Sequence, residues 1–132
     1  MKNELAVFNG AEGTLLGRVP DTKEEKVAMA NAMSTTTGQF SDIINTEILL
    51  INYFVERKQI TDDETGELRS VVRSVLIDSN GMSYNTLSSG IATSLKSIIA
   101  VFGPASAWEE PMRVKVKQVQ SGKGRMYTLE LI

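Results

Sequence analysis

The chain has no cysteine and no histidine among its 132 residues. Without cysteine it can form neither a disulfide nor a thiolate-bound metal site. Without histidine it lacks the side chain that most often serves as a general base or as a zinc ligand. Ser88, Ser89 and Ser94 therefore have no histidine to activate them. These absences predict a protein that is not an enzyme and that needs no metal or cofactor.

Long hydrophobic runs are also absent. Apolar runs such as Ile48 to Ile51 are far too short to span a membrane. The first residues, Met1 to Leu5, lack the apolar centre of a signal peptide. The sequence therefore predicts a cytoplasmic protein with no membrane partner.

Charge is distributed unevenly, although the net charge is only −2. Residues 1–67 carry 6 basic and 12 acidic side chains, whereas residues 68–132 carry 8 basic and 4 acidic ones. No acidic residue lies between positions 112 and 125, a stretch with five basic residues: Arg113, Lys115, Lys117, Lys123 and Arg125. Because such asymmetry can mark an electrostatic binding face, we expect a binding site in the second half of the chain.

The order of elements predicts the fold. Residues 1–40 are expected to form an N-terminal extension with a helix over 22–33, because Asp21 and Glu24 have the spacing of a capping box. Residues 41–132 are expected to form a mainly β domain with strands near 47–60, 70–77, 82–84, 112–120 and 125–131, and a helix over 86–102 capped by Asn85. Three strands, a helix and two strands is the order of the five-stranded OB barrel, a fold that often binds oligonucleotides. The first strand, uniformly apolar at 48–51, suits a barrel strand that bends and changes neighbours.

The strongest candidate site is the basic row on the predicted strand near 112–120. Alternation places Arg113, Lys115 and Lys117 on one face at intervals of roughly 6.6–7 Å, with Lys123 and Arg125 at the following hairpin. Such a row can follow a nucleic-acid backbone and release its counterions. The alternative is an exposed strand whose lysines prevent edge pairing.

Bases also need aromatic faces on which to stack. Tyr84, Trp108 and Tyr127 are the candidates, whereas Tyr53 and Phe54 are more typical of core packing. Further cations on the first hairpin could extend a binding groove: Arg57, Lys58, Arg69 and Arg73.

Four segments resemble small bacteriophage single-stranded-DNA-binding proteins of Gram-positive hosts: Gly90 to Ile98, Trp108 to Pro111, Val114 to Val116, and Gly124 to Leu129. The resemblance covers roughly residues 45–132. It implies an OB barrel in the host cytoplasm that coats single-stranded DNA during viral replication, without strong sequence preference.

Two hypotheses follow. The first is a single-stranded-DNA-binding protein, whose further partners, a second copy or replication proteins, are left open. The second is an interaction protein of the same fold, an assembly factor or an inhibitor of a host protein, which does not bind nucleic acid and uses the acidic first half as its contact surface.

Overall fold

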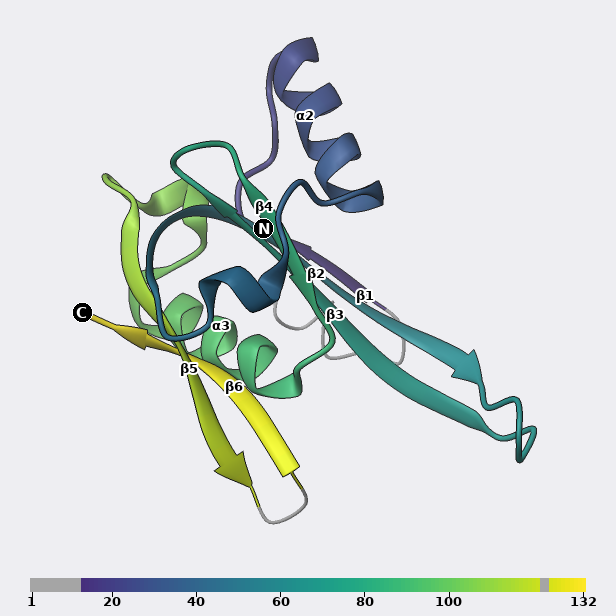
Figure 1. The fold of residues 1–132 in the computed structure, drawn as a ribbon. Coiled ribbons are helices and arrows are strands. Elements are labelled where there is room, and N and C mark those ends of the chain that lie inside the picture. The colour runs from purple at the N-terminus through teal and green to yellow at the C-terminus, as the bar shows by residue number, and fades with distance from the viewer. Residues whose placement is uncertain (1–12, 122–123) are drawn as a thin grey trace.

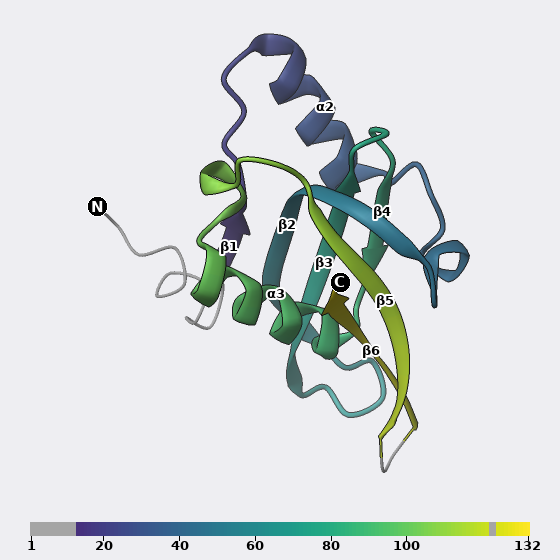
Figure 2. The same ribbon diagram turned by 90° about the vertical axis from the view of Figure 1, so that its left-hand side faces the viewer.

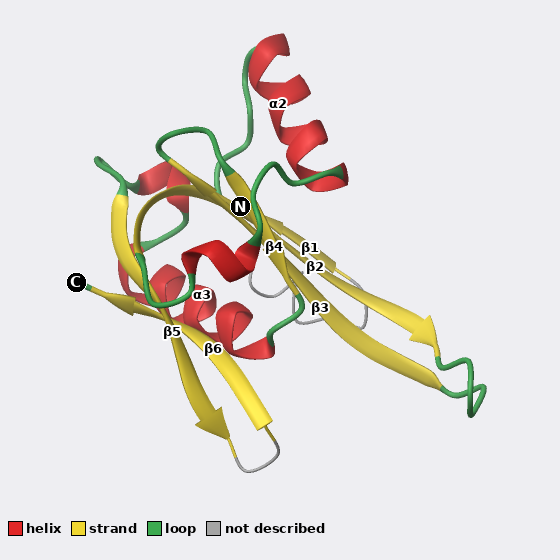
Figure 3. Ribbon diagram, viewed as in Figure 1, coloured by secondary structure: helices red, strands yellow, loops and turns green. Residues whose placement is uncertain are grey.

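The computed structural model describes residues 13–121 and 124–132. It is mainly β, with an antiparallel sheet and two α-helices (Figures 1 and 3). Two short 3-10 helices, η1 (Phe40–Ile43) and η2 (Ala105–Ala107), precede β2 and β5. The other elements, in chain order, are β1 (Gly13–Leu16), α2 (Lys23–Ser34), β2 (Glu47–Thr61), β3 (Leu68–Asp78), β4 (Ser83–Thr86), α3 (Ser89–Phe102), β5 (Met112–Ser121) and β6 (Gly124–Leu131).

The longest strand, β2, bends and changes neighbours. Its first residues, 47–50, pair with β5, whereas 52–61 pair with β3. The register shifts between Leu50 and Asn52, and such a bulge bends a strand. Beyond the bend, where β5 no longer pairs with β2, β1 pairs with residues 54–57 of β2. The bend expected from the apolar run is therefore present, and it sends β5 and β3 in different directions from one strand.

The sheet has the strand order expected of an OB fold, but closure into a barrel is not shown. The order is β4-β3-β2-β5-β6, so β4 and β6 lie at the two ends and, among the described residues, do not pair with each other. The predicted barrel is therefore corrected to an open sheet. The predicted N-terminal helical extension is not supported: residues 1–12 lie outside the described residues, and from residue 13 onward β1 pairs with β2 and the Asn52 side chain bonds the backbone of Arg18. A domain boundary at residue 40 stays a prediction.

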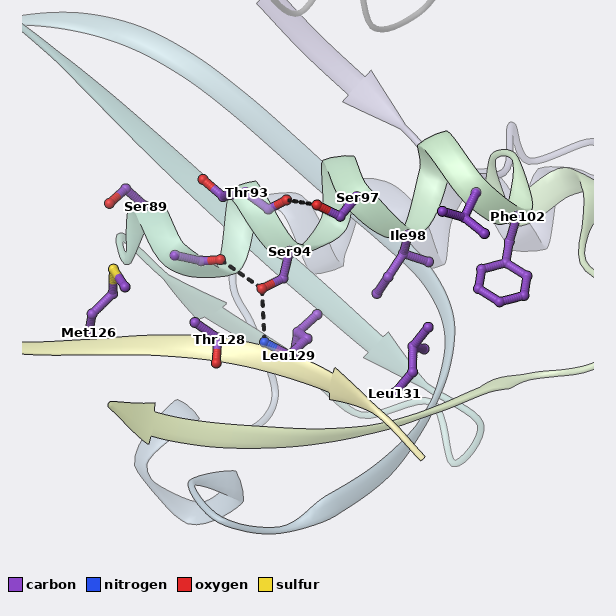
Figure 4. A pocket seen from close by; sticks show the side chains of 12 residues that line it. Ser89, Thr93, Ser94, Ser97, Ile98, Phe102, Met126, Thr128, Leu129 and Leu131 are labelled. Carbon is purple, nitrogen blue, oxygen red and sulfur yellow. Dashed lines mark hydrogen bonds between the residues drawn. The ribbon is translucent and has the colours of Figure 1, made fainter. Parts of the chain in front are cut away.

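Helix α3 lies along the unpaired edge of β6 (Figure 2). Closure of the sheet into a barrel would need this edge to pair with β4. The Oγ atom of Ser94 accepts a hydrogen bond from the Leu129 amide at 3.0 Å and donates to the Gly90 carbonyl at 2.9 Å (Figure 4). The Ser88 hydroxyl makes both of its bonds to β6, accepting from the Tyr127 amide at 3.2 Å and donating to the Tyr127 carbonyl at 3.3 Å. Ser94 of α3 and its N-cap residue Ser88 thus satisfy backbone groups of β6 that a strand would otherwise pair, which protects an exposed edge.

The close approach of α3 to β6 depends on a glycine. A Cβ atom at Gly90 would lie 2.2 Å from the Tyr127 carbonyl oxygen. Further along the helix, Leu95 is fully buried in a core that also contains Leu50, Leu76 and Val116. By length and mean hydropathy, Ser89–Ala107 could cross a membrane. In the structure, however, six α3 residues are buried and its apolar stripe forms one wall of the core.

Both predicted helix starts are shifted. The capping box of α2 uses Thr22, whose Oγ1 accepts from the Glu25 amide, while the Glu25 carboxylate accepts from the Asp21 amide. Threonine thus takes the role predicted for aspartate, one residue later. Helix α3 begins at Ser89 rather than near 86, because Thr86 still pairs with Ser74 in the sheet.

Candidate nucleic-acid interface

The basic row lies on the outward side of β5. Val114 and Val116 are fully buried, and the residues that alternate with them point away from the core. Arg113 has a side chain that is 61% exposed, Lys117 one that is 44% exposed, and Lys115 between them is half-buried. The spacing predicted from the sequence is therefore present on one face.

Two glutamates from the neighbouring strands lie within this row. Glu47 of β2 and Glu130 of β6 are both register partners of Lys115. Their carboxylates reach diagonally, Glu47 to Arg113 Nε at 3.8 Å and Glu130 to Lys117 Nζ at 2.7 Å. We name these five side chains the β5 charged face. Counting acids along the strand missed this pairing, because the acids come from residues distant in sequence.

The middle of the β5 charged face carries the available positive charge. Among the described residues, Lys115 has no carboxylate within 4 Å, although glutamates flank it on both sides. The hydrogen bond and charge of Lys117 hold the pKa of Glu130 below its usual value, and Lys115 adds to the same effect. Glu130 is therefore ionised at neutral pH, and the face has three cations and two anions.

Trp108 lies beside one end of this face. Its indole and Arg113 line the same depression, of about 830 Å³, together with Met112 and Ile132. The indole Nε1 donates to the Gly103 carbonyl at 2.9 Å, and the ring lies 5.9 Å from the ring of Tyr53. Trp108 is partly buried against the core, and the part of the side chain that stays exposed in this depression could stack a base, with Arg113 in the same lining to contact a phosphate. Glu109 and Glu110 also line the depression, so it is not uniformly cationic.

The other two aromatic candidates are not brought to this face. Tyr84 is only 8% exposed and packs in the core, with its ring against Gly38; burial and the nearby Asp78 raise its pKa. Tyr127 pairs with Gln118, which alternates with Lys117, and its ring contacts Phe40 edge-on at 5.2 Å. Its side chain therefore lies on the side of the sheet opposite to the basic row.

The cations of the first hairpin are separate from the β5 charged face. Arg73 of β3 forms an ion pair with Glu56 at 3.7 Å, and Arg57 is half-buried on β2. Lys58 and Arg69 are described only as strand positions, opposite Val71 and Ile60. At the other hairpin, Arg125 is likewise described only as the strand partner of Gln120, and Lys123 lies outside the described residues.

The structure places one further cation, Lys96, near Arg57 of the first hairpin, and the sequence did not predict this neighbour. Lys96 of α3 is half-buried, and burial together with the nearby charge of Arg57 lowers its pKa. The two residues are 39 positions apart, so no local pattern in the sequence could have placed them together.

The element order and the open antiparallel sheet are consistent with the OB-like class of fold, many of whose members bind oligonucleotides. The family model described as phage single-stranded DNA-binding protein matches residues 19–132, and the chain belongs to this family. Its members are DNA-binding, non-enzymatic proteins of bacteriophages, so single-stranded DNA is the partner that membership supports. Searches of curated proteins and of solved structures found no match.

Proposed function

We propose that the β5 charged face binds the backbone of single-stranded DNA without strong sequence preference, and that this binding supports replication of phage DNA. The observation that carries the proposal is Lys115, a lysine on an outward strand face between two further cations, with no ion pair among the described residues. Its charge is available to a phosphate without first breaking an internal contact.

The row suits an extended single strand of DNA because a cation stands at every second residue of β5, at positions 113, 115 and 117. On a β-strand this spacing is roughly 6.6–7 Å, similar to the spacing of successive phosphates in extended single-stranded DNA. Contacts to phosphates carry no sequence information, so a site built from them binds many sequences alike. Trp108 adds a stacking surface that also accepts any base.

A pair of double substitutions tests this assignment. Lys115→Gln with Lys117→Gln removes two cations from the β5 charged face. Lys23→Gln with Lys26→Gln removes the same charge from exposed positions on α2. Binding of labelled oligo-dT is measured by fluorescence anisotropy over a range of salt concentrations. We expect the β5 pair to weaken binding, and to reduce the slope of log K against log salt by about 1.4, since each phosphate contact on a single strand contributes about 0.7.

The α2 pair is expected to keep the wild-type slope. Equal affinities and slopes for both double variants would move the binding site away from β5. Absence of oligo-dT binding by the wild-type protein at low salt would instead favour the interaction protein that does not bind nucleic acid.

A further inference from the structure

We infer that Glu47 and Glu130 are specificity-determining residues that compete with DNA phosphates for Arg113 and Lys117. This inference rests on the proposed function of the β5 charged face. In the free protein, each carboxylate occupies a cation at one end of the row and leaves the central Lys115 available.

The geometry distinguishes these glutamates from acids that merely lie nearby. Each is a register partner of Lys115, yet each carboxylate reaches the cation two residues along β5, one toward Arg113 and the other toward Lys117. A phosphate that approaches either end must therefore displace a carboxylate already in place. A phosphate that approaches Lys115 has no ion pair to break among the described residues, although both glutamates are register partners of this lysine.

This arrangement selects for ligands with several linked phosphates. A single anion gains one contact at Lys115, and at the ends it only replaces one carboxylate by another acceptor. A polynucleotide that engages Lys115 holds its neighbouring phosphates at high effective concentration beside both ends, where they can displace the carboxylates. The glutamates thus lower overall affinity and restrict tight binding to chains.

The two ion pairs are poor candidates for a role in folding. The glutamate side chains are 50% and 54% exposed, and exposed ion pairs contribute little to stability. Neutralising the glutamates is therefore expected to change DNA binding while leaving the fold intact.

The test compares Glu130→Gln and Glu47→Gln with Glu24→Gln, which removes the same charge from an exposed site on α2. Anisotropy titrations with oligo-dT at one moderate salt concentration give the affinities. We expect Glu130→Gln to tighten binding roughly 2- to 5-fold, the range that an exposed ion pair corresponds to. Glu47→Gln has a smaller effect because its contact is longer, and Glu24→Gln has none.

A double-mutant cycle separates competition from a general change in charge. Glu130→Gln is repeated in the Lys117→Gln background, where the ammonium group that the carboxylate contacts at 2.7 Å is gone. The gain in affinity should disappear there. A gain that persists without Lys117, or one that Glu24→Gln reproduces, overturns the inference. Loss of binding in the β5 lysine variants, with no gain in the glutamate variants, rejects the inference but keeps the proposed site. Wild-type affinity in the lysine variants rejects the site itself.

Discussion

The two α-helices in the described part of the chain are nearly equal in length but are held in different ways. Six residues of α3 are buried, and the helix lies along the open edge of the sheet (Figure 2). In α2 only Met29 is buried, and Val27 is 51% exposed. Helix α3 is thus part of the core, whereas α2 lies beyond one end of the sheet, near the turn between β3 and β4 (Figures 1 and 2).

Helix α2 is instead anchored through the segments at its two ends. Before it, the Asn52 side chain bonds both the N–H and the C=O of Arg18. After it, Thr37 and Ser83 exchange hydrogen bonds between hydroxyl and backbone groups, and the Gly38 amide donates to the Ser83 carbonyl at 2.8 Å. A helix held in this way can open locally without exposing the main core, because few of its side chains contribute to that core.

The largest effect should come from truncating the core of α3. Leu95→Ala removes a fully buried side chain and leaves a cavity between the helix and the sheet. We expect the free energy of unfolding to fall by about 2–5 kcal/mol, measured by chemical denaturation. A loss below 1 kcal/mol would show that α3 is as loosely held as α2 and would remove the contrast between the helices.

A smaller loss of stability is expected from truncating Ser94 of α3, compared with truncating Ser97 of the same helix, which lacks the bond to β6. Both hydroxyls bond a carbonyl one turn back in the helix, but only that of Ser94 also accepts from the amide of Leu129 on β6 (Figure 4). Ser94→Ala leaves that amide unpaired and should cost about 1–3 kcal/mol. Ser97→Ala, its matched control, should stay within about 0.5 kcal/mol of the wild type in the same denaturation assay.

Equal losses for the two serine variants would mean that the bond to β6 contributes nothing beyond the local helix contact. Alternatively, faster hydrogen exchange confined to Leu129 in Ser94→Ala would locate the effect at the sheet edge, even where the change in global stability is small.

The sequence predicted much of the fold because its signals are local. Alternation and turn residues gave the hairpin of β5 and β6 to within one residue at its inner ends. The apolar stripe predicted for α3, which comprises Ile91, Leu95, Ile98, Ile99 and Phe102, is buried except for Phe102, which is 49% exposed. Closure of the barrel was expected from element order alone. Order does not say whether the last strand pairs with β4 or is satisfied by a helix, which depends on contacts such as that of Ser94.

The candidate site was less predictable than the fold for the same reason. The outward direction of Arg113, Lys115 and Lys117 follows from alternation within one strand. Their pairing with Glu47 and Glu130 depends on which strands flank β5 and in what register, and those acids lie outside the local window. The exposure of the aromatic side chains was equally hard to predict, because the position of Tyr84 after a turn does not indicate that its ring is buried.

The smallest effect should come from truncating the buried residue of α2. Met29→Ala removes the one buried side chain of that helix, which lies outside the main core cluster, and alanine is itself a better helix former. We expect the free energy of global unfolding to fall by only about 1 kcal/mol. The amides of α2 should exchange hydrogen faster while those of α3 keep their protection. Val27→Ala, on the same helix but exposed, is the control and should leave both patterns unchanged. Loss of protection in α3 as well would mean that the two helices open as one cooperative unit, and that α2 belongs to the core after all.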